Sequence, residues 1–264
     1  MFYRKISKLI DEHFMNLDNP ILIIDGARQI GKSFIIREIA KSKFKNYIEI
    51  NMYNDALGDK LFEHVNSIDS FYLQVSMIAG DKLGTKEDTI IFLDEVQVYP
   101  HLLTLLKFLK SDNRYTYVCS GSQLGIALKK TTSIPMGSIN KVRMYPMDFE
   151  EFLLANNVGE NVINYLKDCF SNKKNIDESI HHKIMSLFKV YLYVGGLPDA
   201  VKAYVEKKNV LNVNNVHLQT QEYYIEDATK YDLDNKLKIT RMYELVPSYI
   251  ENKVKKICEE KNYE

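Results

Sequence analysis

Eight consecutive residues, from Gly26 to Ser33, have the types and the spacing of a phosphate-binding loop. The sequence GARQIGKS matches G-x-x-x-x-G-K-[ST], which cradles phosphates when it lies between a strand and a helix. Gly31 lets the backbone approach a phosphate, Lys32 is expected to reach the β- and γ-phosphates, and Ser33 to ligate Mg²⁺. The residues expected to contact the nucleotide here are Gly26, Ala27, Arg28, Gln29, Ile30, Gly31, Lys32, Ser33 and Phe34.

Two carboxylates, Asp94 and Glu95, follow the apolar residues 90–93. A similar apolar run, residues 21–24, precedes the phosphate-binding loop. Asp94 is expected to hold Mg²⁺ through a water, and Glu95 to polarise the attacking water. A carboxylate directly after the Mg²⁺ aspartate is typical of P-loop enzymes that hydrolyse ATP. A strand that simply ends in acidic residues at the surface is the alternative explanation, and the phosphate-binding loop upstream makes it the weaker one.

Small polar residues follow a third apolar run, residues 115–119. Either Ser120 or Ser122 is expected to lie between the two motifs, near the γ-phosphate, although an ordinary Ser-Gly turn would have the same sequence. The base is expected to be adenine, because every Asn-Lys pair of the chain lacks the aspartate of the guanine signature NKxD. The sequence therefore predicts ATP and Mg²⁺ as cofactors.

The elements that must position these residues alternate between strand and helix over residues 20–146. Such alternation predicts an α/β layered fold with a parallel sheet. ATP-hydrolysing P-loop enzymes insert an extra strand between the loop strand and the acidic strand, and residues 115–119 are the expected one. The predicted strands are 21–25, 47–51, 89–95, 115–119 and 139–145. The predicted helices are 4–15, 32–42 and one that begins at Pro100, and residues 58–79 are mostly helical in pattern.

The pattern changes after Pro146, where helical periodicity replaces strands. We expect an ATP-binding core over residues 1–147 and a helical region over residues 148–264. The chain ends in a polar helical stretch with no stop signal, so the native chain is expected to continue past Glu264.

Composition excludes several classes of protein. Lys and Arg total 35, as do Asp and Glu, so strong DNA binding is not supported by charge.

No apolar run approaches the length of a membrane span, and the charged N-terminus does not resemble a signal peptide. Three well-separated cysteines show no disulfide or metal pattern, which favours a cytoplasmic location. His181 and His182 lack further ligands at metal-binding spacing and are expected on a helix surface.

Taken together, five segments resemble the AAA-type P-loop ATPases of archaea and bacteria that are related to the STAND and archaeal-ATPase groups. These segments are GARQIGKS (26–33), IIFLDEVQ (90–97), SGSQLG (120–125), YPMDFEEFL (145–153) and YVGGLPDAV (193–201). The resemblance implies a P-loop NTPase (AAA-type) core with a helical C-terminal lid. It also implies ATP and ADP as ligands and is compatible with a homo-oligomer. Members commonly carry a further C-terminal domain with a restriction-endonuclease-like fold.

The resemblance assigns the turn Gly195–Pro198 to the adenine end of the site. Pro198 offers a rigid apolar face there, and the glycines leave room for a flat base. A helix-starting turn is the plainer explanation of the same residues, and both can hold at once. The apolar lining is expected from the helix before the turn, at Phe188, Val190, Tyr191 and Val194.

One position departs from the resemblance. Many members carry Gly-Arg, a candidate arginine finger, where this chain has Gly137-Ser138. Arg143 and Arg114 are the alternatives, and simple solvation at the surface is the competing explanation for both. Three functions therefore stay open: an ATP hydrolase whose cycle moves the lid, a slowly hydrolysing nucleotide-gated switch or scaffold, and a DNA-associated ATPase.

Overall fold

The computed structural model describes residues 2–122, 137–229, 237–238, 240–246 and 248–250. Residues 123–125 of the segment SGSQLG lie outside the described residues, as do Cys258 and the rest of the polar stretch at the end of the chain, residues 252–264. None of the predicted site residues is among them.

The centre of the fold is a five-stranded parallel sheet with the order β2-β3-β4-β1-β5. β4 pairs with β1 on one side and with β3 on the other, so the predicted insertion of this strand is confirmed. The α/β fold of a P-loop ATPase is confirmed with it. The strands are β1 (Ile21–Asp25), β2 (Asn46–Asn51), β3 (Thr89–Asp94), β4 (Thr116–Gly121) and β5 (Ile139–Arg143).

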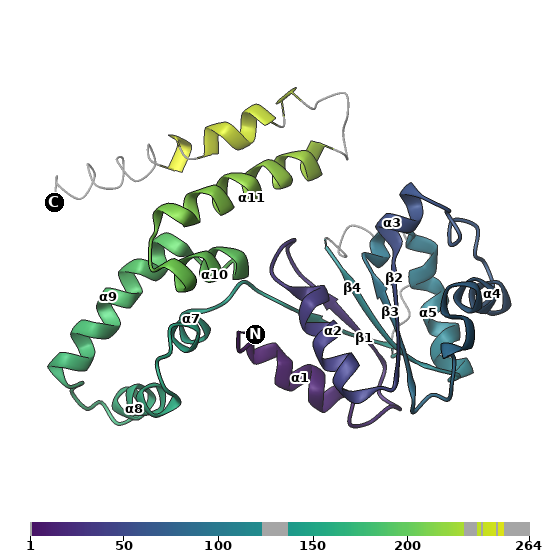
Figure 1. Ribbon diagram of the computed structural model, residues 1–264, viewed down its shortest axis with the longest axis horizontal. Helices are drawn as coiled ribbons and strands as arrows, with labels where there is room; N and C mark the ends of the chain where they lie inside the picture. The colour runs from purple at the N-terminus through teal and green to yellow at the C-terminus, as the bar shows by residue number, and fades with distance from the viewer. Residues whose placement is uncertain (1, 123–136, 230–236, 239, 247, 251–264) are drawn as a thin grey trace.

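Helices cover both faces of the sheet (Figure 1). Alternate residues of β1 separate between the faces, Ile21 and Ile23 to one core and Leu22 and Ile24 to the other, as the two-residue period of a strand requires. The first core includes α4 (Ile68–Ala79) and α5 (Pro100–Asp112), and the second includes α1 (Lys5–His13) and α2 (Lys32–Lys43). Cys119 is fully buried in the first core.

Residues 58–79, whose pattern is mostly helical, form a helix only from Ile68 onward. α3 (Met52–Leu57) ends before Gly58, and α4 does not begin until Ile68. The carboxylate of Asp55 accepts hydrogen bonds from the backbone N–H groups of Leu61 and Phe62, which fixes a turn in place of a helix. Ser67 then starts α4 with a capping box to Ser70.

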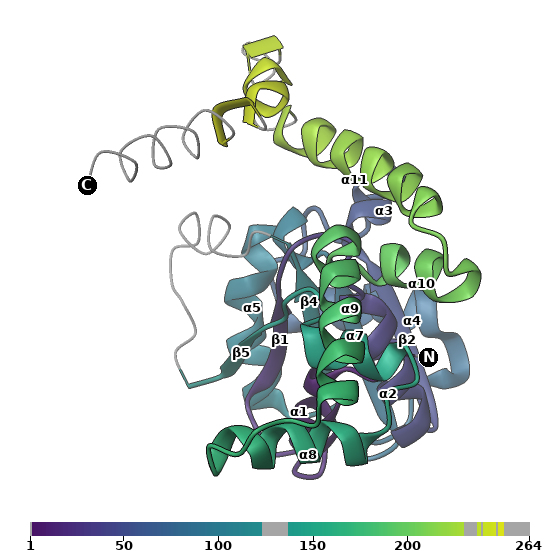
Figure 2. The same cartoon turned by 90° about the vertical axis from the view of Figure 1, so that its left-hand side faces the viewer.

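The helical part of the chain begins at Phe149 and packs around a third core (Figures 1 and 2). Asp148 caps the first of its helices through a capping box with Glu151. These helices are α7 (Phe149–Ala155), α8 (Glu160–Ser171), α9 (Glu178–Val194), α10 (Pro198–Lys207) and α11 (Leu211–Thr229). His181 and His182 are exposed on α9, as predicted. None of the helices among the described residues is both long and apolar enough to cross a membrane.

Candidate functional site

The loop over residues 26–33 connects β1 to α2 at the carboxyl edge of the sheet. Gln29 and Gly31 have left-handed backbones, with φ of 62° and 89°. A Cβ atom on Gly26 would lie 2.4 Å from the carbonyl oxygen of Met144, so only glycine fits where the loop passes the end of β5. The loop therefore wraps back to the N-terminus of α2, whose unpaired N–H groups suit an anion.

Lys32 is buried, 5% exposed, and its ammonium group lies over its own loop. Nζ donates to the carbonyl oxygens of Gly26, at 3.0 Å, and Ala27, at 2.7 Å. Burial lowers the pKa of Lys32 below its ordinary value, while the negative charges of Glu95 and Asp94 oppose that shift. The lysine is thus a desolvated cation beside the helix N-terminus.

Asp94 accepts hydrogen bonds from three surrounding elements. Ser33 Oγ donates to both carboxylate oxygens, at 2.9 and 3.0 Å, and Ser120 Oγ donates to Oδ1. Asn51 Nδ2 donates to Oδ2 at 3.1 Å. Asn51 was not predicted from the sequence. It is a polar residue at the end of β2, paired in register with Asp94, and that position is a usable signal for a site residue.

Glu95 lies directly after Asp94 and has its own partners. Its backbone is left-handed, with φ of 54°. Ser122 Oγ donates to Glu95 Oε2 at 3.3 Å, and the side-chain amide of Gln97 donates both to Glu95 Oε2 and to Ser122 Oγ. The two serines that the sequence could not separate therefore have different partners, because Ser120 binds Asp94 and Ser122 binds Glu95. Gln97 was missed as well.

The oxygen atoms at the loop suit a magnesium ion. Mg²⁺ takes oxygen ligands and usually keeps several waters beside one or two carboxylates and the phosphates of a substrate. The Ser33 hydroxyl and the Asp94 carboxylate supply such oxygens side by side. Within the described part of the chain, no group of three or more His, Cys, Asp or Glu residues could hold a metal, so an all-protein cage is not found there.

Two cavities meet at the loop and share Gln29, Gly31 and Phe34. The polar one, of about 480 Å³, is also lined by Arg28, Lys32, Ser33, Tyr53, Glu95, Tyr223 and Glu226. The larger one, of about 650 Å³, is lined by the apolar residues Phe2, Ile35, Met147, Pro198 and Val205 and by the charged residues Arg4, Asp199, Lys202 and Glu206. Both volumes fall in the range of small-molecule sites. A phosphate end and an apolar end thus adjoin across the loop.

Pro198 begins α10 and lies beside the loop, its Cγ 3.7 Å from the position that a Cβ of Gly31 would take. Gly196 accepts a hydrogen bond from the N–H of Met147 at 2.7 Å, and a Cβ there would lie 2.2 Å from the Met147 carbonyl oxygen. The turn is therefore held against the connection between β5 and α7.

The apolar lining differs from the expectation. Phe188, Val190, Tyr191 and Val194 of α9 do not line the larger cavity. Phe188 and Tyr191 contact the ring of Phe149, and Val194 is buried in the third core. Phe2, Met147 and Val205 line the cavity instead. The apolar stripe of α9 stabilises the helical part itself, which the spacing of the stripe could not reveal.

The two arginine-finger candidates lie in different places. Arg143 ends the edge strand β5 and is exposed, with its guanidinium 5.4 Å from the ring of Tyr145. Arg114 precedes β4, at the edge of the sheet away from the loop, where it pairs with Asp112 at 3.4 Å and lies over Tyr72.

Two further residues contact the loop and were not singled out from the sequence. Arg4 donates from Nη1 to the carbonyl oxygen of Ile30 at 2.8 Å. Tyr224 of α11 donates from its hydroxyl to the carbonyl oxygen of Arg28 at 3.0 Å. Both contacts join residues far apart in the chain through main-chain oxygens, which leave no signature in the sequence.

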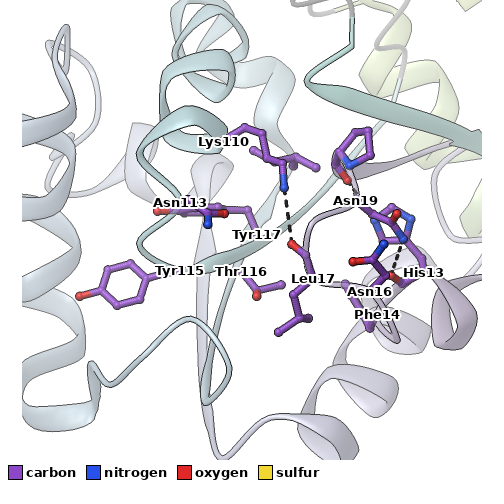
Figure 3. A pocket seen from close by; sticks show the side chains of 12 residues that line it. His13, Phe14, Asn16, Leu17, Asn19, Lys110, Asn113, Tyr115, Thr116 and Tyr117 are labelled. Atoms are coloured by element: carbon purple, nitrogen blue, oxygen red, sulfur yellow. Dashed lines mark hydrogen bonds between the residues drawn. The ribbon is translucent and has the colours of Figure 1, made fainter.

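A third cavity, of about 20 Å³, lies at the amino ends of β1 and β4 (Figure 3). Lys110 donates to the carbonyl oxygen of Leu17 there at 3.5 Å, and the His13 ring contacts the carbonyl oxygen of Pro20 at 3.0 Å. The volume suits about one water molecule. This cavity is therefore too small for a nucleotide and lies at the wrong edge of the sheet.

Comparison with known proteins gives one family. A family model described as an AAA domain matches residues 18–153, which hold the loop, the acidic strand end and both serines. No curated protein matches the chain.

Two solved structures match most of this chain at low identity. The Walker-type ATPase PABY2304 of Pyrococcus abyssi has a TM-score of 0.48 at 14% identity, over 95% of this chain and 78% of that one. The S. cerevisiae Hsp104-ADP complex has a TM-score of 0.44 at 14% identity, over 99% of this chain and 40% of that one.

Proposed function

The chain belongs to the AAA domain family, and from this membership we propose that it binds ATP with Mg²⁺ and hydrolyses the γ-phosphate. One observation carries the proposal. The hydroxyl of Ser33, from the loop, and the carboxylate of Asp94, from the acidic strand, are in direct contact beside Lys32 and Glu95. A phosphate-binding loop, oxygen ligands for a cation and a candidate base thus converge on one polar cavity.

Each residue has a defined role in the proposed reaction. Lys32 exchanges its two loop carbonyls for oxygens of the β- and γ-phosphates, and the N–H groups of the loop bind the same phosphates. Ser33 and Asp94 hold Mg²⁺, which when bound neutralises charge on the phosphates. Glu95 accepts a proton from the water whose oxygen bonds to the γ-phosphorus. The bond from that phosphorus to the β,γ-bridging oxygen breaks, ADP leaves with the electron pair, and inorganic phosphate is the second product. Ser120 and Ser122 orient Asp94 and Glu95.

The adenine is proposed to occupy the larger cavity, against Pro198 and Phe2. Support comes from the apolar residues there and from the shared wall with the polar cavity. We propose a division into a core, residues 1–147, and a C-terminal region, residues 148–264. The term lid is used for helices α7–α11 of that region. Nucleotide that contacts both Gly31 and Pro198 would draw lid and core together, so hydrolysis would be coupled to their relative movement.

A homo-oligomer is part of the proposal, with Arg143 as its candidate arginine finger.

A slowly hydrolysing switch is the second candidate function. Its support is that Glu95 Oε2 already accepts hydrogen bonds from Gln97 and Ser122, which leaves only the other carboxylate oxygen, Oε1, to accept a proton from the attacking water. A DNA-associated ATPase has weaker support, because the chain has no net charge.

The experiment that tests these functions is the steady-state release of phosphate from ATP, with and without Mg²⁺ and with and without duplex DNA. A Mg²⁺-dependent basal rate, abolished by Glu95→Gln, supports the hydrolase. A negligible rate together with tight ATP binding selects the switch. Stimulation by DNA that falls as salt rises selects the DNA-associated ATPase. Absence of both binding and hydrolysis contradicts the proposal.

A further inference from the structure

Arg4 is a buried cation that lines the larger cavity but has no step of its own in the proposed reaction. It lies just before α1, is 6% exposed, and its guanidinium contacts three separate segments. Nη1 donates to the carbonyl oxygen of Ile30 in the loop at 2.8 Å, and Nη2 donates to that of Tyr145 at 2.6 Å. Nε donates to the carboxylate of Glu151 in α7 at 3.2 Å. One side chain therefore joins the phosphate-binding loop, the connection after β5 and the first helix of the lid.

Glu151 is the lid's half of this contact and is equally buried, with its side chain 6% exposed. Its Oε1 accepts a hydrogen bond from the N–H of Lys5 at 2.6 Å, and its Oε2 accepts one from the N–H of Asp148 at 3.1 Å. The same carboxylate thus closes the capping box that starts α7. Because both charges are buried, separating Arg4 from Glu151 would leave each charge without a partner in a site of low polarity. The N-terminal segment that carries Arg4 and helix α7 that carries Glu151 should therefore move together.

The contact continues into the rest of the lid. Phe152, next to Glu151, is fully buried, and its ring lies 5.2 Å from Tyr191 of α9 and 6.1 Å from Tyr204 of α10. α10 also begins with Pro198, beside Gly31. Packed side chains therefore connect Arg4 to the helix that faces the larger cavity.

We propose that Arg4 is a positioning residue that couples the conformation of the phosphate-binding loop to the position of the lid, through its simultaneous bonds to Ile30 and Glu151. This inference rests on the proposed function for its role in an ATP cycle, but the coupling itself exists without nucleotide. It differs from simple fastening of α1 to α7. With simple fastening, any contact that holds α1 against α7 would serve equally well. With coupling, the effect requires the hydrogen bond from Arg4 to Ile30 in the phosphate-binding loop.

Lys5 provides the matched control for this difference. Its ammonium pairs with Asp148 at 2.6 Å and Glu150 at 2.9 Å, so it also joins α1 to the start of α7. The Lys5–Asp148 pair is about half exposed and does not reach the loop. Lys5→Gln therefore removes a fastening contact between the same elements and leaves Arg4 in place.

The test compares Arg4→Gln, Glu151→Gln and Lys5→Gln in the full chain, by hydrogen exchange of residues 26–34 without nucleotide and by titration of a fluorescent ATP analogue. We expect Glu151→Gln, a change in the lid, to speed exchange in the loop about tenfold and to weaken analogue binding by a similar factor, within the usual range of coupling between sites. Arg4→Gln should do the same, the double variant should add little to either, and Lys5→Gln should leave both readouts unchanged. Should Arg4→Gln fail to fold, Glu151→Gln carries the test, because the one amide oxygen of glutamine can still accept from the N–H of Asp148 and keep the capping box of α7, while the charge of the carboxylate is lost.

Unchanged loop exchange in Glu151→Gln, or equal effects of Lys5→Gln and Glu151→Gln, would overturn the coupling. Failure of the proposed function is distinguishable, because it would appear as absence of analogue binding by the wild-type chain. The nucleotide-free exchange of the loop would still decide the inference in that case.

Discussion

The hydroxyl of Ser33 and the carboxylate of Asp94 are hydrogen-bonded at 2.9 Å, although 61 residues separate them in the chain. Ser33 lies in the first turn of α2, and Asp94 is the last residue of β3. β3 is not next to β1 in the sheet, because β4 lies between them. The contact therefore exists because the first turn of α2 lies at the carboxyl edge of the sheet, where β3 also ends.

The substitution Asp94→Asn tests the proposed cation site. The asparagine amide keeps an oxygen for the Ser33 hydroxyl but loses the negative charge that attracts Mg²⁺. We expect the Mg²⁺ concentration that gives half-maximal hydrolysis to rise by about tenfold or more, the usual cost of weakening a metal's environment. Titration of the hydrolysis rate with Mg²⁺ measures this, and an unchanged midpoint would remove Asp94 from the site.

Replacement of Glu95 by glutamine tests the proposed base. Binding of ATP should persist, while turnover should fall by about 10² to 10⁴, the usual range for the loss of a general base. Phosphate release beside a binding titration separates the two effects. Glu38→Gln, which changes an exposed carboxylate of α2, is the control and should keep the rate. A Glu95→Gln variant that hydrolyses ATP as fast as the wild type contradicts the assignment.

The lowered pKa of Lys32 predicts proton uptake when ATP binds. Burial lowers this pKa below its ordinary value of 10.5 in the protein alone, and the phosphates should raise it in the complex. Between the two pKa values the complex holds more protons than the separate partners, so ATP affinity should fall as pH rises from the pKa of Lys32 in the free protein to its pKa in the complex.

Calorimetric titrations in buffers of different ionisation enthalpy measure that uptake. Lys32→Arg is the control, because an arginine stays protonated and the variant should bind ATP without this proton uptake. Equal proton uptake in the wild type and in Lys32→Arg would show that another group titrates.

Replacement of Pro198 by alanine tests the adenine end of the site. The loss of a ring face against the base should weaken ATP binding by about 1 kcal/mol, near fivefold. In the wild type, ATP should slow the hydrogen exchange of residues 193–205 as lid and core close. Exchange that ATP does not alter, together with unaltered affinity in Pro198→Ala, would leave the turn with a structural role alone.

The centre of the sheet could be predicted from the sequence because β1, β3 and β4 are buried. A strand covered on both faces must be an apolar run, and the runs here end at glycine, proline or acidic residues. The insertion of β4 between β1 and β3 was predicted from the carboxylate after Asp94. The contacts between Ser33, Asp94 and the two serines are then a consequence of parallel strands that end at one edge.

Other features depend on contacts that no local pattern contains. The turn after α3 forms because Asp55 accepts bonds from Leu61 and Phe62, and helical periodicity does not register such a bond. The apolar stripe of α9 indicated burial but not which residues it packs against. Arg4 binds main-chain oxygens, which every residue has. Its role could be recognised only once the loop and α7 were placed together.

The most direct test of the proposed nucleotide site is the equilibrium titration of a fluorescent ATP analogue into the wild type and Lys32→Ala. The variant loses a charge-assisted contact in a partly dry site, so its affinity should fall by at least about 2 kcal/mol, near 30-fold. Lys41→Ala, on the exposed side of the same helix, should bind like the wild type. Equal affinity of Lys32→Ala and the wild type would contradict the account.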